Sequence, residues 1–176
     1  PQADGVGHED GCDDEKVHQL LAAYDSLLAS LAGRLAGSAR IVVTGDHGLQ
    51  DVPDERVFFL DEDDPMAGAL SCPPSGEPTV PFFHVKEGRA EEFAAAFRER
   101  WGGDFALLTR AEVEELELMG PGKLSPATAA RIGDLVAVPR RPASLRWRPK
   151  SGNVRVHRGE HGGLTPAETR VPLILA

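Results

Sequence analysis

Apolar residues recur along positions 15–35 at the three- and four-residue spacing of an amphipathic helix. Asp13 or Asp14 can cap the first turn of this helix. The run Ile41-Val42-Val43 follows, and it predicts a short strand buried on both faces of a sheet. A helix followed by such a strand indicates an α/β fold. The apolar stripe of the helix comprises Val17, Leu20, Leu21, Tyr24, Leu27, Leu28, Leu31 and Leu35.

Residues 79–139 predict a compact α+β subdomain inserted into the main sheet. Its main helix is expected to bury one face between Ala90 and Trp101, and strands are expected at 80–85, 105–108 and 135–138. A capping box at Thr109 to Glu112 and a helix start at Ser125-Pro126 mark its shorter helices.

The flanking segments complete the predicted organisation. Residues 61–78 and the basic segment 140–150 are expected to be loops, and residues 171–175 a last strand. We therefore expect a metal-binding α/β core whose first part is 1–78 and whose last part is 140–176, with 79–139 inserted between them.

Charge and cysteine content narrow the function classes. The 176 residues carry a formal net charge of -9, which disfavours binding of duplex nucleic acid but permits a small phosphorylated substrate if metal ions reverse the local sign. Two cysteines, Cys12 and Cys72, are too few for a disulfide scaffold, and we expect a cytoplasmic protein. The sequence contains no apolar run of membrane-spanning length, so no membrane partner is expected.

Three short motifs carry candidate chemistry. Asp4 and His8 lie four residues apart in a glycine-rich segment that predicts a turn; Asp46 and His47 directly follow the apolar strand; His161 lies within Gly-Glu-His-Gly-Gly. The carboxyl ends of strands are where α/β folds place their sites. Mixed Asp and His donors without a nearby cysteine suit Zn²⁺ or Mn²⁺ better than a structural cysteine-type zinc site.

In this order, the motifs DGVGHEDG, TGDHGL and GEHGG resemble the alkaline phosphatase superfamily, and most closely its type I phosphodiesterase/nucleotide pyrophosphatase members. The resemblance implies an alkaline-phosphatase-like, mostly parallel sheet flanked by helices, of which this chain holds a part. It makes Asp4, His8 and His161 ligands of one metal ion, and Asp46 and His47 ligands of a second. Two divalent ions about 4 Å apart, Zn²⁺ or alternatively Mn²⁺, would act on a phosphodiester or a nucleotide pyrophosphate.

The resemblance also implies a Thr or Ser nucleophile and a further aspartate upstream of the first motif. Three residues precede Asp4, so we expect a fragment that is inactive or nearly so without the N-terminal half of the same protein. The alternatives are a metal-dependent phosphoglycerate mutase or phosphomonoesterase of the same superfamily, and a non-catalytic binding module. The upstream sequence would separate these alternatives.

Two structural expectations accompany this interpretation. The five ligand side chains should converge in one cleft at the carboxyl edge of the sheet. The strands at 41–43 and 171–175 need cover on both faces, so the chain alone is expected to expose apolar surface and to self-associate. His157, four residues before His161, could support the ligands from outside the metal site.

Overall fold

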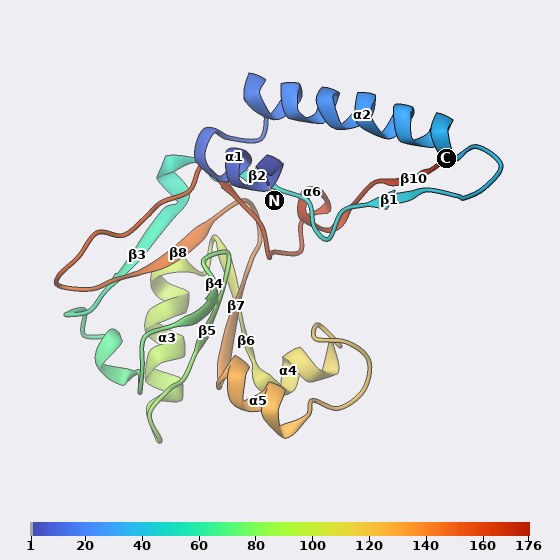
Figure 1. Cartoon of the computed structure of the whole chain (residues 1–176). Helices are drawn as coiled ribbons and strands as arrows, with labels where there is room; N and C mark the ends of the chain where they lie inside the picture. Colours follow the sequence, from blue (N-terminus) through green and yellow to red (C-terminus); the bar gives the residue numbers. More distant parts are fainter. Residues whose placement is uncertain (1) are drawn as a thin grey trace. The chain divides into compact units, whose positions relative to one another are not determined.

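The computed structural model describes residues 2–176, which form two compact units (Figure 1). Pro1, the first residue of the predicted core, lies outside the described residues. The domain boundaries at residues 78 and 139 stay predictions. The first unit comprises the chain up to Asp51 together with His157–His161 and Thr165–Ala176; the second comprises Val52–Val156 and Gly162–Leu164.

The first unit joins the two ends of the sequence through two short antiparallel pairings, β1 with β10 and β2 with β9 (Figure 1). Its longest helix, α2, begins at the N-cap Asp14, whose side chain accepts a hydrogen bond from the Lys16 amide. The elements of this unit are α1 (Gln2–Asp10), α2 (Glu15–Leu35), β1 (Val42–Thr44), β2 (Gln50–Asp51), β9 (Gly159–Glu160), α6 (Pro166–Thr169) and β10 (Leu173–Leu175).

The first motif lies on a helix, and the prediction of a turn there is wrong. Gly5 and Gly7 have weak helix propensity, which favoured a turn in the sequence. Helix α1 nevertheless packs closely on β9: a Cβ atom on Gly159 would lie 2.5 Å from the Gly7 carbonyl oxygen. Tertiary packing therefore overrides local propensity in α1.

Burial in the first unit is also lower than predicted. Val17 is the buried residue of α2, whereas Leu27 of the same stripe is 66% exposed. Strand β1 pairs with β10, and Val42 is 61% exposed instead of covered on both faces. No element within residues 2–176 covers these apolar side chains, which is why the double burial inferred from composition is absent.

The exposed β1–β10 ribbon makes self-association a specific prediction. Ile174 is 52% exposed at the centre of the ribbon, opposite Val43. Replacing it with lysine (Ile174→Lys) should lower the mean mass in light scattering, because a charge on the ribbon opposes apolar association. Ser30→Lys adds the same charge on exposed α2 and should leave association unchanged. A monodisperse monomer of the unaltered chain at high concentration would contradict this prediction.

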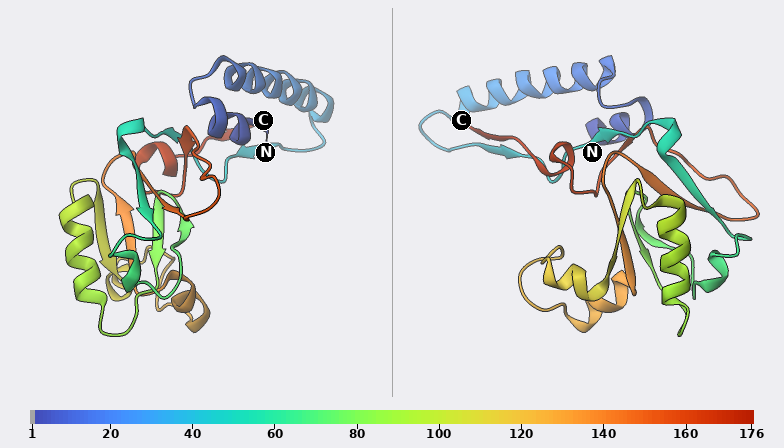
Figure 2. Two further views of the ribbon diagram at one scale, coloured as in Figure 1. Left: turned by 90° about the vertical axis from the view of Figure 1, so that its left-hand side faces the viewer. Right: turned by 180° about the vertical axis from the view of Figure 1, so that it is seen from behind.

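The second unit is built on a four-stranded antiparallel sheet in the order β4-β5-β7-β6 (Figure 2). A separate parallel pair, β3 with β8, packs beside it. The elements are η1 (Asp54–Arg56), β3 (Val57–Asp61), η2 (Ala67–Ala69), β4 (Ser75–Glu77), β5 (Val80–Phe83), α3 (Ala90–Trp101), β6 (Phe105–Thr109), α4 (Arg110–Glu115), α5 (Pro126–Ile132), β7 (Leu135–Pro139) and β8 (Ser144–Arg148).

Successive side chains of β7 point to opposite faces of this sheet and contribute to a hydrophobic cluster on each face. Leu135 and Ala137 join the larger core, in which Phe93 and Phe97 of α3 are almost fully buried. Val136 faces the opposite side, with buried side chains of α4 and α5. The helical stripe of α3 and the capping box of α4 are confirmed, because both follow from local spacing.

Two segments predicted as loops contribute to the core. Residues 140–150 contain β8, in which Ser144 and Leu145 are buried and the guanidinium of Arg146 donates to the Arg155 carbonyl at 2.8 Å. Residues 61–78 contain η2 and β4, with Leu70 in the larger core. High charge and proline content concealed both regular segments, because such a composition is typical of loops.

No helix within residues 2–176 is both long and apolar enough for a membrane span. The sequence predicted a mostly parallel sheet. Among the described strands, β3 and β8 pair in parallel, and the other pairs are antiparallel.

Candidate metal centre

Helix α1 places Asp4 and His8 one turn apart on the same face. Nε2 of His8 lies 3.3 Å from Oδ1 of Asp4. Nδ1 of the same ring lies 2.6 Å from the carbonyl oxygen of Gly159. A carbonyl oxygen only accepts hydrogen bonds, so Nδ1 carries a proton, and in the neutral ring Nε2 presents a lone pair toward Asp4.

The segment that carries the third motif is held directly against α1. The Arg158 amide donates to the His8 carbonyl at 2.8 Å, and β9 pairs Glu160 with Gln50 of β2. The glycine at position 159 permits this approach, as its backbone touches α1. The first and third motifs therefore meet through backbone contacts, not through side chains alone.

The structure brings Asp4, His8 and His161 together: one ligand atom of each lies within 4.8 Å of the others. The ring of His47 stacks on that of His161, with centroids 3.8 Å apart. Asp46 is placed differently, because its side chain is 93% exposed and Oδ1 lies 3.9 Å from Nε2 of His47. Four of the five predicted ligands thus gather, and Asp46 points into solvent beside them.

The Asp4–His8–His161 group fits a cation. Oδ1 of Asp4 is buried and has no hydrogen-bond donor within residues 2–176. This oxygen faces the lone pair of His8 Nε2, and two acceptors repel each other unless a proton or a metal ion lies between them. Two imidazoles and one carboxylate form a common ligand set for a divalent ion with an open coordination position.

The second motif repeats the same histidine orientation. Nδ1 of His47 donates to the Gly48 carbonyl at 2.9 Å, which leaves Nε2 as the acceptor on the side of Asp46. Gly48 is required at this point, because a Cβ atom there would lie 1.9 Å from the Ala167 carbonyl oxygen of α6. Backbone carbonyls therefore fix the tautomers of both histidines, as is usual for metal ligands.

From the sequence, Glu160 could either tune the neighbouring ligand or face water, and His157 was considered only as an outer support. His157 and Glu160 join His8 in a second group whose ligand atoms lie within 4.8 Å of one another. Glu160 is 2% exposed, which is unusual for a carboxylate. Its spacing three residues after His157 was the available signal, but burial cannot be read from a two-residue strand.

Cys12 should react slowly with thiol reagents. Burial, followed by the hydrogen bond and negative charge of Asp51, raises the pKa of the Cys12 thiol to about 12. At pH 8 only about one thiol in 10⁴ is then ionised, and the thiolate is the reacting form. Cys72 is exposed. Ellman's reagent should show a fast Cys72 phase and a Cys12 phase at least about 100-fold slower. Cys72→Ser should leave only the slow phase; two equal rates would contradict the raised pKa.

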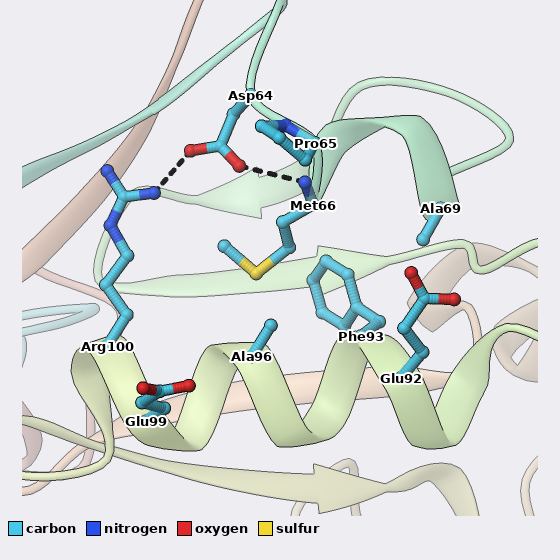
Figure 3. A pocket seen from close by; sticks show the side chains of 9 residues that line it. All are labelled: Asp64, Pro65, Met66, Ala69, Glu92, Phe93, Ala96, Glu99 and Arg100. Carbon is cyan, nitrogen blue, oxygen red and sulfur yellow. Dashed lines mark hydrogen bonds and ion pairs between the residues drawn. The ribbon is translucent and has the colours of Figure 1, made fainter.

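The second unit contains a cavity of about 460 Å³ between α3 and the segment that leads into η2 (Figure 3). Met66 and Phe93 line it, and Asp64 pairs with Arg100 at one end. The lining contains no histidine or cysteine. It offers apolar and acidic surface but none of the predicted metal ligands.

The geometry defines a candidate divalent-metal centre made of histidine and carboxylate ligands on an α/β scaffold. The model of the type I phosphodiesterase/nucleotide pyrophosphatase family matches residues 1–164, so the chain belongs to this family. A comparison with curated proteins gives no match.

Solved structures have a similar fold. Human ectonucleotide pyrophosphatase/phosphodiesterase 5 is 19% identical, with 98% of this chain and 44% of that chain covered and a TM-score of 0.73. The murine protein, solved in an inactive form with AMP, is also 19% identical, with 97% and 44% covered and a TM-score of 0.70. Phosphonoacetate hydrolase from Sinorhizobium meliloti, in complex with phosphonoformate, is 21% identical, with 97% and 43% covered and a TM-score of 0.67.

These likenesses confirm the predicted alkaline-phosphatase-like α/β fold. The chain spans about 44% of the length of the ectonucleotide pyrophosphatase/phosphodiesterase structures.

Proposed function

We propose that this chain is the metal-binding part of an enzyme that hydrolyses phosphodiester or nucleotide pyrophosphate bonds. The observation that carries the proposal is the meeting of Asp4, His8 and His161, whose ligand atoms lie within 4.8 Å of one another. Membership of a phosphodiesterase/nucleotide pyrophosphatase family supports hydrolysis over the mutase alternative.

In this proposal Asp4, His8 and His161 hold one ion, and Asp46 and His47 contribute to a second. Zn²⁺ fits the mixed donors best, and Mn²⁺ is the alternative. A bound ion would supply Lewis-acid stabilisation of negative charge on phosphoryl oxygens. The chain's own task is to orient its ligands: the Gly159 carbonyl fixes the ring of His8, and the Gly48 carbonyl fixes that of His47.

We propose a small, nucleotide-like substrate. The murine relative binds AMP, and the bacterial relative binds phosphonoformate, a phosphate-like anion. A net charge of -9 works against a long polyanion, whereas local metal charge suits a small one. The nucleophile, a Thr or Ser, would come from another part of the same protein. The two cysteines support a reducing, cytoplasmic setting within this proposal.

The test is an assay of the full-length protein on bis-p-nitrophenyl phosphate with added Zn²⁺ or Mn²⁺, with and without His161→Ala. The same variant is examined for metal content, so that loss of activity can be assigned to loss of the ion.

A further inference from the structure

A second ligand group shares His8 with the first. Its members are His157 and Glu160 in addition to His8. The rings of His8 and His157 have centroids 4.6 Å apart, and Nδ1 of His157 lies 3.9 Å from Oε1 of Glu160. Arg158 and Gly159 lie between His157 and Glu160 and hydrogen-bond to His8 of α1. These bonds hold His8, His157 and Glu160 close together.

We propose that His8, His157 and Glu160 form an additional divalent-cation position. Two imidazoles and one glutamate are a ligand set found in catalytic zinc sites, with one coordination position left open. The position differs from the Asp4–His8–His161 group in two of its three ligands. Glu160 takes the place of Asp4, and His157 takes the place of His161.

The burial of Glu160 supports a cation here. The residue is 2% exposed, and buried carboxylates are hydrogen-bonded, paired with a charge or bound to a metal ion. A divalent ion coordinated by this carboxylate and by two neutral imidazoles would be such a partner. Contacts of Glu160 with protein groups alone, His157 among them, predict no affinity for a metal ion.

The two positions share one lone pair. Nδ1 of His8 is occupied by the Gly159 carbonyl, so only Nε2 is available for a metal ion. An ion in the first group therefore withdraws His8 from the second and leaves it with His157 and Glu160 alone. Occupancy of the additional position should consequently rise when Asp4 and His161 are removed.

The experiment is a Co²⁺ titration of this chain, followed by visible absorption. The Asp4→Asn/His161→Ala variant should still bind Co²⁺ with the bands of a low-coordinate site. Adding His157→Ala to it should weaken binding by at least about 100-fold, since a direct ligand matters more than an outer partner. Adding His18→Ala, an exposed histidine of α2, should change nothing. A folded Asp4→Asn/His161→Ala variant without Co²⁺ binding would overturn the proposal.

A milder variant keeps the test valid if the double variant unfolds. In His161→Ala, long-range ¹H–¹⁵N spectra should show Zn²⁺ shifting ring nitrogens of both His8 and His157. A Zn²⁺ response at His8 without one at His157, or no response at either, would overturn the additional position. Metal binding by the unaltered chain that is weakened by Asp4→Asn but not by His157→Ala is read separately and reports on the proposed function.

Discussion

Replacing His161 with alanine in the full-length protein is expected to lower the hydrolysis of bis-p-nitrophenyl phosphate by about 10³-fold, which corresponds to about 4 kcal/mol of transition-state stabilisation. The variant removes one of the three ligands that meet in the Asp4–His8–His161 group. It also removes the ring on which His47 stacks, at a centroid distance of 3.8 Å. Both halves of the proposed metal centre are therefore affected by a single change.

The matched control is His18→Ala. His18 lies on the same unit, in α2, and is exposed. It should keep full activity and full metal content. Equal activity of His161→Ala and the unaltered protein under limiting Zn²⁺ would show that His161 is not a ligand, whatever the fold of the chain. Activity lost together with the circular dichroism spectrum of the folded protein would point to a misfolded variant. A folded variant that loses activity but keeps one metal ion is expected if that ion occupies the additional position.

Local spacing predicted much of the second unit. The burial of Phe93, Phe97 and Trp101 on α3 follows from a period of 3.6 residues. The capping box at Thr109 and Glu112 is likewise present, with the Thr109 amide 2.7 Å from the Glu112 carboxylate. Such features depend on neighbours within one helical turn, and a single sequence contains all the information they need.

Long-range contacts determined what the sequence could not show. The sequence of β8 is typical of a basic loop, and its strand structure is recognisable only from its pairing with β3. In that pairing Arg148 of β8 donates a hydrogen bond to the carboxylate of Asp61. Helix α1 has glycines that disfavour it locally, and its close contact with Gly159 becomes visible only in three dimensions. Both errors have the same origin, because the stabilising partner lies more than 80 residues away in the sequence.

The candidate site divides in the same way. The residue types of the three motifs identified Asp4, His8, His47 and His161, and the structure gathers these four. It could not be foreseen that Asp46 would be 93% exposed, since side-chain direction at the end of a strand depends on the turn that follows. The burial of Glu160 likewise depends on its pairing with Gln50, which no local pattern encodes.

The chain alone is expected to hydrolyse bis-p-nitrophenyl phosphate more slowly than the full-length protein by about 10³-fold or more, because losing a covalent nucleophile costs at least that much in enzymes that use one. The ligands of the first group are all present here, so the chain should still bind a metal ion. The chain and the full-length protein should therefore differ far more in the rate of turnover than in their affinity for Zn²⁺.

Both quantities need to be measured on the same preparations. Zn²⁺ affinity comes from competition with a chromogenic chelator, and turnover from release of p-nitrophenolate. The Asp4→Asn/His157→Ala variant of the chain serves as the control for metal binding. It replaces the carboxylate that faces His8 with an uncharged amide of the same shape, and it removes a ligand of the additional position. If the chain alone turned over at the rate of the full-length protein, the nucleophile would have to lie within these 176 residues, and the division of roles proposed for this family member would be wrong.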